Sequence, residues 1–331
     1  MKKITLALLL LVLIFSPVLG LVGCKQSTPN TIRINEVTHS VFYAPLYLAI
    51  NLGFMEDEGL TIDLAAAEGS NTSMATLLSN NCDIALAGPE TVVYVAAGEA
   101  QIQPVVFGQL TKRDGSFLVS KTNIQNFNWS THLKNKTVIA GRAGGLPAMT
   151  FEWVVNSLGM FRGNGITLDT DTSFAMQVPT FEATSAEFCT MFEPTASEFQ
   201  AAGKGYIVAS IGEQSGEIPY TCFIAKPEYL RNNSEKIQRF LRAIKRAYTY
   251  IYTAEESDVA EALKSSFPST SKESLEYAIH SYKQIDAWMA TPAMTESSYN
   301  RLIEVLKNSS DFNQNVSYST VVDNTYAYLV A

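Results

Sequence analysis

The chain has 331 residues, 47% hydrophobic and 17% charged, so it can fold as a globular protein large enough for two hydrophobic cores. Its formal net charge is −8, and loss of Lys2 and Lys3 with a leader would make it −10. This acidic balance argues against nucleic acid as a partner and against electrostatic adhesion to anionic lipid.

The N-terminus predicts a secretory leader. Lys2 and Lys3 precede the apolar run 4–15, which is shorter than the roughly 20 residues of a membrane helix. The run is followed by Leu21-Val22-Gly23-Cys24, an ending that resembles the bacterial lipobox. By that resemblance residues 1–23 are a signal peptide, Cys24 carries a lipid, and 24–31 form a lipidated N-terminus and polar tether. The alternative is an ordinary cysteine in a cleaved leader.

Beyond the tether, strand-like and helix-like segments alternate. Proline at an early helical position and glycine at the stop mark a helix between Pro45 and Gly53. The pattern predicts strands at 32–37, 61–65 and 83–87 and helices at 45–53, 70–79 and 89–97.

The same series recurs about 105 residues later. Asn51-Leu52-Gly53-Phe54 is echoed by Ser157-Leu158-Gly159-Met160. Two α/β units of the same order imply two similar lobes. In the second unit we expect strands at 137–140, 166–169, 187–192 and 206–210, with helices at 147–159, at 174–181 and from Pro194.

After Tyr220 the pattern changes to one strand followed by long helices. The strand is expected at 221–225, and the helices at 235–252, 257–267, 272–289 and 295–308. A terminal helical block without strands of its own must pack on an existing lobe, and we expect the first. The predicted fold is therefore α/β and two-lobed, each lobe a mostly parallel sheet flanked by helices. We place lobe 1 at 32–116 plus 222–331 and lobe 2 at 117–221, with crossings near 114–120 and 216–223.

The remaining cysteines are Cys82, Cys189 and Cys222, each in an apolar stretch that favours a buried thiol. Their odd number allows at most one disulfide, and their spacing is unlike that of a metal site. The sequence contains no HExxH, GxSxG, P-loop or GxGxxG motif. We therefore predict no catalytic residue, no metal site and no cofactor.

Ligands of open α/β sheets bind beyond the carboxyl ends of strands, where helix N-termini offer free N–H groups. In the first unit three loops have this position: 38–43, 68–72 and 87–91. Aromatic and polar side chains could stack on and hydrogen-bond a flat ligand, and a glycine allows close approach. The candidate binding residues are His39, Phe42, Tyr43, Ser70, Asn71, Gly88 and Thr91, and Glu90 could point the same way. The alternatives are core packing of the aromatic rings and ordinary capping or turn residues.

Three loops of the second half add further candidates. Loop 141–147 has three glycines before a helix, so its N–H groups and Arg142 could hold a carboxylate, sulfonate or phosphate. Loops 192–195 and 216–220 are candidates for the same reason, and the second of them lies at the expected second crossing, where Tyr220 could cap the cleft. The candidates are Arg142, Gly144, Gly145, Glu193, Thr195 and Tyr220. The alternatives are a surface arginine beside a flexible turn, and core or hinge packing of Tyr220.

Several of these segments resemble the NMT1/THI5-like family. They are Phe42-Tyr43-Ala44-Pro45-Leu46-Tyr47-Leu48-Ala49, Gly53-Phe54, Glu58-Gly59-Leu60, the Arg142 loop, Phe192-Glu193-Pro194-Thr195 and Ile218-Pro219-Tyr220-Thr221. The resemblance covers roughly 32–260. The family holds solute-binding proteins of ABC importers for nitrate, sulfonates, taurine and thiamine-pyrimidine precursors. It implies a periplasmic-binding-protein type II fold, in which two lobes joined by two crossovers close on one ligand.

The resemblance implies an extracytoplasmic, membrane-anchored and monomeric lipoprotein that passes a small solute to an ABC permease with a cytoplasmic ATPase. The aromatic loop favours a flat nitrogen heterocycle such as a thiamine-pyrimidine precursor, and the Arg142 loop favours a sulfonate, nitrate or taurine-type anion. One branch of the family instead synthesises a thiamine pyrimidine with a cysteine-rich run, which this sequence lacks. A lipoprotein receptor that binds another protein is a further alternative.

Overall fold

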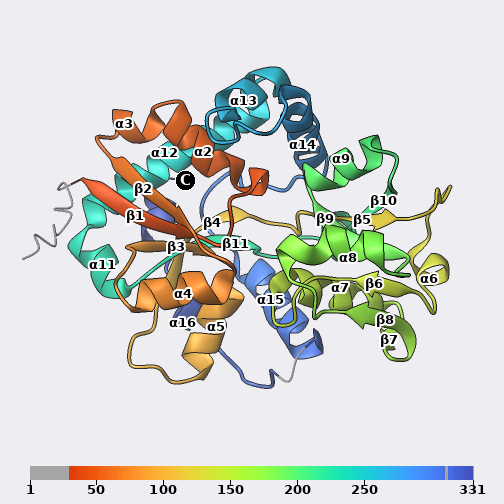
Figure 1. Ribbon diagram of the computed structural model, residues 1–331. Helices are drawn as coiled ribbons and strands as arrows, with labels where there is room; N and C mark the ends of the chain where they lie inside the picture. Colours follow the sequence, from red (N-terminus) through yellow and green to blue (C-terminus); the bar gives the residue numbers. More distant parts are fainter. Residues whose placement is uncertain (1–29, 310–311, 331) are drawn as a thin grey trace, which may run out of the picture. The chain divides into compact units, whose positions relative to one another are not determined.

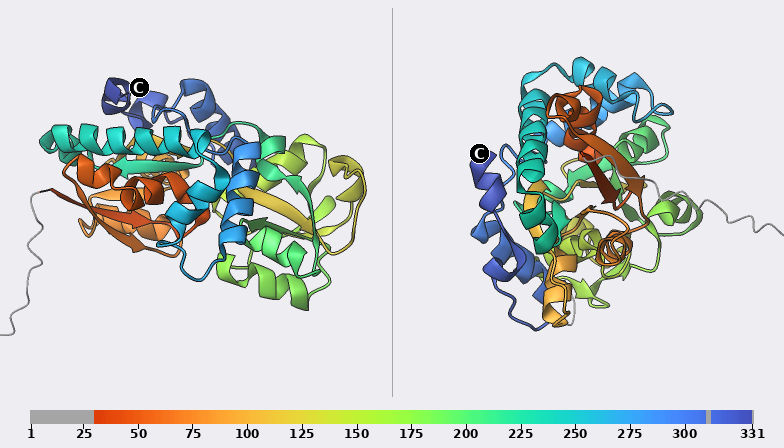
Figure 2. Two further views of the ribbon diagram at one scale, coloured as in Figure 1. Left: turned by 90° about the horizontal axis from the view of Figure 1, so that it is seen from above. Right: turned by 90° about the vertical axis from the view of Figure 1, so that its left-hand side faces the viewer.

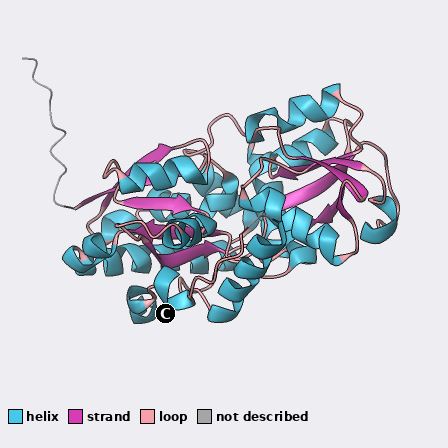
Figure 3. Cartoon of the chain, turned by 90° about the horizontal axis from the view of Figure 1, so that it is seen from below, coloured by secondary structure: helices cyan, strands magenta, loops and turns pink. Residues whose placement is uncertain are grey.

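Two mixed sheets form the framework of the computed structural model, which describes residues 30–309 and 312–330. The first has the order β2-β1-β3-β11-β4, and these strands span Thr61–Ala66, Thr31–Glu36, Ile84–Ala87, Thr221–Ala225 and Val105–Thr111. The second has the order β10-β5-β9-β6-β8-β7, with spans Tyr206–Ser210, Ser116–Ser120, Phe188–Phe192, Thr137–Ile139, Gly165–Asp169 and Phe161–Arg162. Figure 1 shows helices around both sheets, and Figure 3 shows the strands in two groups.

The helices follow the strands in the expected alternation. In the first half of the chain they are η1 (Val41–Tyr43), α2 (Ala44–Asn51), α3 (Phe54–Asp57), α4 (Ser70–Leu78), α5 (Glu90–Ala97), α6 (Trp129–His132) and α7 (Leu146–Ser157). Then come η2 (Phe174–Met176), α8 (Gln177–Ala183), α9 (Thr195–Ala201) and α10 (Ile211–Ser215). The terminal helices are α11 (Pro227–Asn232), α12 (Ser234–Thr253), α13 (Glu256–Leu263), α14 (Lys272–Gln284), α15 (Glu296–Ser309), α16 (Tyr318–Val321) and α17 (Thr325–Val330).

Burial explains why these segments take these conformations. All residues of the inner strands β3 and β11 are buried, whereas the edge strand β2 is largely exposed. In α12 the buried side chains include Ile237, Leu241, Ile244, Tyr248 and Ile251, whose spacing of three or four residues makes one apolar face. The expected elements are thus confirmed within a few residues, as are buried thiols at Cys82, Cys189 and Cys222.

The structure departs from the predicted pattern in two respects. The sequence pattern predicts neither β4 nor β5, although both strands are almost fully buried. The helix expected at 272–289 ends at Gln284, because Asp286 has a φ of 52° and the next residues extend beside β4. There Met289 N–H donates to Leu110 O at 3.1 Å, and Gln109 N–H donates to Pro292 O at 2.8 Å.

Most strands of each sheet run in one direction, as predicted, and one strand in each sheet runs against the others. Parallel pairs join β1 to β2 and β3, while β11 runs antiparallel to both of its neighbours. In the second sheet β5 is likewise antiparallel to its neighbours, and β6 pairs in parallel with β8 and β9. The antiparallel strands adjoin the points where the chain passes from one sheet to the other.

The terminal helices reach beyond the first sheet. Helix α12 contacts α2, α3 and α17, and its Tyr248 hydroxyl donates to Gln109 O of β4 at 2.6 Å. Figure 2 shows it running alongside the first sheet. Helix α14 also contacts α9, and α15 packs on α7 of the second sheet. In that contact Arg301 lies over the Trp153 ring at 5.4 Å, and Asn156 donates to Asn308 at 2.9 Å. The terminal helices therefore pack on helices of the second sheet as well as on the first lobe, where we expected all of them.

The chain crosses between the sheets twice, through 112–115 and through 211–220. The two crossings lie side by side, since Ile218 N–H donates to Lys112 O at 2.9 Å and Tyr220 N–H to Thr111 O at 3.1 Å. Asp114 joins them, because one of its oxygens accepts from Ser116 N–H at 2.7 Å and the other from the Tyr220 hydroxyl at 3.0 Å.

None of the helices in the described residues combines the length and apolar character that crossing a membrane requires. The signal peptide expected at 1–23, the lipid on Cys24 and most of the tether to residue 31 lie outside the described residues.

Candidate functional site

A buried carboxylate marks the place where loops from the two sheets meet. Glu90 begins α5, directly after β3, and is 1% exposed. Its carboxylate folds back over Gly88, where an added Cβ would lie 2.0 Å from Oε2. Any side chain at position 88 would therefore displace this carboxylate. Oε2 has no hydrogen-bond partner with acceptable geometry in the described part of the chain.

Loop 68–72 supplies the next wall. Ser70 is the first residue of α4, and its Oγ accepts a hydrogen bond from Gly88 N–H at 3.4 Å and lies close enough to interact with the Glu90 carboxylate. Gly69, with a φ of +111°, packs against the Arg142 guanidinium, which an added Cβ would approach to 3.4 Å. Arg142 comes from the loop between β6 and α7, so residues of the two sheets touch here.

The helices behind these loops also meet. The Tyr94 hydroxyl of α5 hydrogen-bonds Met149 Sδ of α7 at 3.4 Å. The guanidinium of Arg142 makes no hydrogen bond or ion pair within residues 30–309 and 312–330, yet its charge is close enough to stabilise the charged form of Glu90. Burial nevertheless dominates and raises the pKa of Glu90 to about 7.

Two tyrosines complete this group from the side of the first sheet. Tyr43 is 6% exposed, and its hydroxyl lies close enough to the Thr221 side chain to interact with it. Tyr220 is 5% exposed and its hydroxyl donates to Asp114. Both rings lie near the Glu90 charge, and burial raises the pKa of both hydroxyls above their usual value. We call Tyr43, Ser70, Glu90, Arg142 and Tyr220 the Glu90 junction.

Other candidates lie outside the junction. Phe42 is 1% exposed, and its ring packs at 5.2–5.8 Å against Tyr282, Phe192 and Tyr220. An added Cβ at Gly115 would lie 2.5 Å from it. This placement matches the alternative of core packing for Phe42.

His39 turns toward the terminal helices. Its Nδ1 and Nε2 hydrogen-bond Glu36 Oε1 at 2.9 Å and Ser266 O at 2.8 Å, and its ring stacks on Phe267. The Glu36 hydrogen bond raises the pKa of His39. Glu193 faces α9 and α14 instead: its Oε2 accepts from Ser197 N–H at 3.0 Å, and its N–H donates to the Tyr282 hydroxyl.

The remaining candidates are small or exposed. The Thr91 hydroxyl donates to Gly88 O at 2.7 Å and so braces the turn beneath Glu90. The N–H of Gly145 donates to Arg142 O at 3.1 Å, which closes the turn that carries the arginine. Three further candidates are exposed: Asn71, Gly144 and Thr195.

Sequence reasoning gives Glu90 only as a companion of Thr91 and misses Asp114. Burial and the close approach to Gly88 are what separate Glu90 from Thr91. Asp114 lies in a turn next to Gly115, so its sequence context is typical of an exposed loop, but it is fully buried. Burial raises the pKa of Asp114 to about 6, while hydrogen bonds from Ser116 and Tyr220 oppose the shift.

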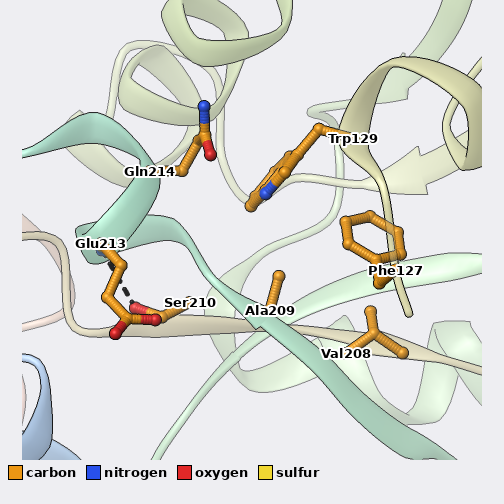
Figure 4. Close-up of a pocket in the computed structure, with 7 residues that line it drawn as sticks. All are labelled: Phe127, Trp129, Val208, Ala209, Ser210, Glu213 and Gln214. Carbon is orange, nitrogen blue, oxygen red and sulfur yellow. Dashed lines mark hydrogen bonds between the residues drawn. The ribbon is translucent and has the colours of Figure 1, made fainter. Parts of the chain in front are cut away.

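Two surface pockets lie away from the junction. One, of about 280 Å³, is lined by Phe127, Trp129 and residues 208–210, 213 and 214 (Figure 4). The other, of about 350 Å³, lies between α7 and α15 beside Trp153 and Lys307. Neither contains a predicted binding residue.

The paired crossings and the two mixed sheets define a class, the periplasmic-binding-protein fold. Similar solved structures include a ligand-binding component of an ABC-type import system from Staphylococcus aureus with zinc bound, at TM-score 0.71 and 13% identity, covering 91% of this chain and 99% of that one. The aliphatic sulphonate binding protein SsuA from Escherichia coli matches at TM-score 0.67 and 14% identity, covering 84% and 91%. At these identities the likeness concerns the fold alone.

Sequence comparison identifies the family. Residues 41–257 match the family described as NMT1/THI5 like. A Bacillus subtilis (strain 168) relative named "Putative binding protein YtlA" is 37% identical over 309 residues, covering 93% of this chain and 92% of that protein. The chain therefore belongs to the NMT1/THI5-like family, as the resemblance in its sequence implies.

Proposed function

We propose that this protein is the extracytoplasmic substrate-binding lipoprotein of an ABC importer. The observation that carries the proposal is the Glu90 junction, where loops that follow strands of two different sheets bring polar groups together. In this interpretation the sheets are the cores of lobe 1 (32–116 plus 222–331) and lobe 2 (117–221). The crossings at 112–115 and 211–220 form the hinge, and the solute binds between the lobes.

The solute is small and polar or anionic, and the leading candidate is a heteroaromatic molecule like a thiamine-pyrimidine precursor. The tyrosines of the junction support a flat ligand, and the unpaired Arg142 guanidinium beside the glycine-rich turn supports an anionic group. A sulfonate, nitrate or taurine-type anion is the second candidate, and the same arginine supports it.

Binding rather than catalysis is the proposed role. The cysteine-rich run of the synthase branch is missing from this sequence, and Cys82, Cys189 and Cys222 are buried and far apart in the chain. The partners are the permease and its ATPase, and the protein acts as a monomer held at the outer face of the membrane by a lipid on Cys24.

Mass spectrometry of protein purified without added ligand tests the function most directly. We expect a bound small solute that is released on denaturation. That compound should then raise the melting temperature by several degrees at saturation, since binding to the folded state adds RT ln(1 + [L]/Kd). If no small molecule is retained and the protein instead captures another protein, the receptor alternative replaces this proposal.

Anchoring is tested separately by Cys24→Ser. Loss of the thiol that carries the lipid should move the protein from the membrane fraction to the soluble or secreted fraction. A variant that stays with the membrane would contradict the lipoprotein assignment but would leave solute binding untouched.

A further inference from the structure

The Glu90 carboxylate lacks a partner in a place where partners are expected. A buried carboxylate oxygen without a hydrogen bond destabilises the fold, because it has lost its hydrogen bonds to water and no protein group replaces them. Glu90 is 1% exposed, and its Oε2 is unpaired within the described residues. An unpaired buried group of this kind requires an explanation, and a bound ligand is one.

Several donors around Glu90 are committed to other groups. The Tyr220 hydroxyl donates to Asp114, and the Tyr43 hydroxyl lies close enough to the Thr221 side chain to interact with it. The Thr91 hydroxyl donates to the Gly88 carbonyl. Cys222, whose pKa burial raises, also lies near the Glu90 charge and is only a weak donor. The Ser70 hydroxyl lies close enough to interact with the carboxylate, yet Oε2 itself has no hydrogen-bond partner in the described residues. A ligand can supply the donor that Oε2 lacks.

Arg142 offers the opposite chemistry on the other side of loop 68–72. Its guanidinium packs on Gly69 and makes no ion pair in the part of the chain that the structure describes. The exposed Arg142 and the buried Glu90 are thus two unmatched charged groups that flank one loop. A small molecule that spans this loop would meet an acceptor at one end and a bidentate donor at the other.

We propose that Glu90 is a ligand-binding residue and that the solute presents an N–H group to it while an acceptor or anionic group meets Arg142. This inference rests on the proposed function and narrows it to solutes with an amine or a ring amino group. Gly88 contributes to the same site, because only a residue without a side chain leaves room for the Glu90 carboxylate in this position.

Two matched pairs of probes test the inference by calorimetric titration. One pair is a hydroxymethyl aminopyrimidine and the same pyrimidine without its amino group. The other is taurine and ethanesulfonate, which differ by the amine. We expect the wild-type protein to bind the amino member of at least one pair at least tenfold more tightly. Glu90→Gln should abolish that preference, because a neutral amide replaces the carboxylate acceptor.

Glu99→Gln is the matched control, since Glu99 is an exposed carboxylate just beyond the other end of α5 and its loss should keep the preference. Glu90→Asp shortens the side chain by one methylene and moves the carboxylate away from the ligand. This variant replaces Glu90→Gln if the latter does not fold, and it should also lose the preference. Equal binding of both members of each pair by the wild type would overturn the inference yet support solute binding. An unchanged preference in the Glu90 variants, or no binding of any probe, would also overturn the inference. Mass spectrometry of the retained ligand would then test the proposed function independently of it.

Discussion

Asp114 and Glu90 are both buried carboxylates close to the places where the two sheets meet, but their surroundings differ. Asp114 accepts hydrogen bonds from the Ser116 backbone, the Ser116 hydroxyl and the Tyr220 hydroxyl, so both of its oxygens are paired. Within the described residues Glu90 Oε2 is unpaired, and so is the Arg142 guanidinium across loop 68–72. Burial alone therefore does not reveal what a carboxylate does, and the completeness of hydrogen bonding distinguishes Asp114 from Glu90.

The difference has an energetic consequence. Around Asp114 the polar groups of the two crossings satisfy one another, which favours one fixed arrangement of the two chain segments. At the Glu90 junction the protein leaves polar groups uncompensated, and only an added partner can recover that cost. Asp114 should therefore stabilise the fold, whereas Glu90 should lower the stability of the empty protein and, together with Arg142, support affinity.

Asp114→Ala tests the structural half of this contrast and should have the largest effect. It would leave the Ser116 N–H, the Ser116 hydroxyl and the Tyr220 hydroxyl without their acceptor, at a total cost on the order of 4 kcal/mol. Denaturant unfolding of the ligand-free protein should show this loss as a lower midpoint. An unchanged midpoint would mean that water replaces the carboxylate and that the crossings do not depend on Asp114.

Sequence patterns predicted the alternation of elements because hydrophobic periodicity and glycine or proline stops are local signals. The strand at Thr221–Ala225 and helix α12 are examples. Helix α15 was expected on the first lobe, yet it packs on α7, because which face another helix covers is a tertiary property.

The candidate site was predictable only at the level of loops. Arg142 and Ser70 lie in loops that follow strands, a position that topology associates with ligands. Aromatic residues in the first loop were ambiguous, and the structure places Phe42 in the core. Glu90 required coordinates, since its importance depends on what lies around it in space.

Glu90→Gln should alter the pH dependence of stability in the ligand-free protein. The folded-state pKa of Glu90, about 7, exceeds the usual 4.5, so the wild type loses stability as pH rises from about 4.5 to 7. The permanently neutral variant avoids this loss. Its free energy of unfolding should exceed that of the wild type by about 3 kcal/mol at pH 8 and by under about 1 kcal/mol at pH 5.

Urea unfolding at the two pH values measures this difference, and Glu99→Gln controls for a general change in surface charge. Identical pH profiles for Glu90→Gln and the wild type would show that Glu90 is solvated or paired in solution. The contrast with Asp114 would then disappear.

Arg142→Ala should act on affinity and leave the empty protein almost unchanged. The exposed guanidinium makes no hydrogen bond or ion pair in the described residues, so the fold does not depend on it. Its charge-assisted hydrogen bonds to a ligand would be worth about 1.5–3 kcal/mol, so affinity should fall on the order of tenfold or more. Titration of the retained solute into this variant and into Lys134→Ala, an exposed control on the same half of the chain, makes the comparison. A lower melting temperature with intact affinity would place Arg142 among the structural residues.

Tyr220→Phe should have the smallest effect and tests whether the crossings belong to the hinge or to the binding site. The substitution keeps the ring beside Phe42 and removes only the hydroxyl that donates to Asp114 at 3.0 Å. We expect a cost of about 1 kcal/mol, larger at pH 8 than at pH 5, because a hydrogen bond to a charged carboxylate is the stronger one. The hydroxyl also lowers the pKa of Asp114, so its loss should raise that pKa above about 6, which NMR titration of the carboxyl can follow.

Affinity of the Tyr220→Phe variant for the retained solute should stay within a factor of about two, well short of the tenfold that 1.4 kcal/mol represents. If affinity instead falls tenfold with the same small change in stability, the Tyr220 hydroxyl contacts the ligand, and the binding site extends into the crossings.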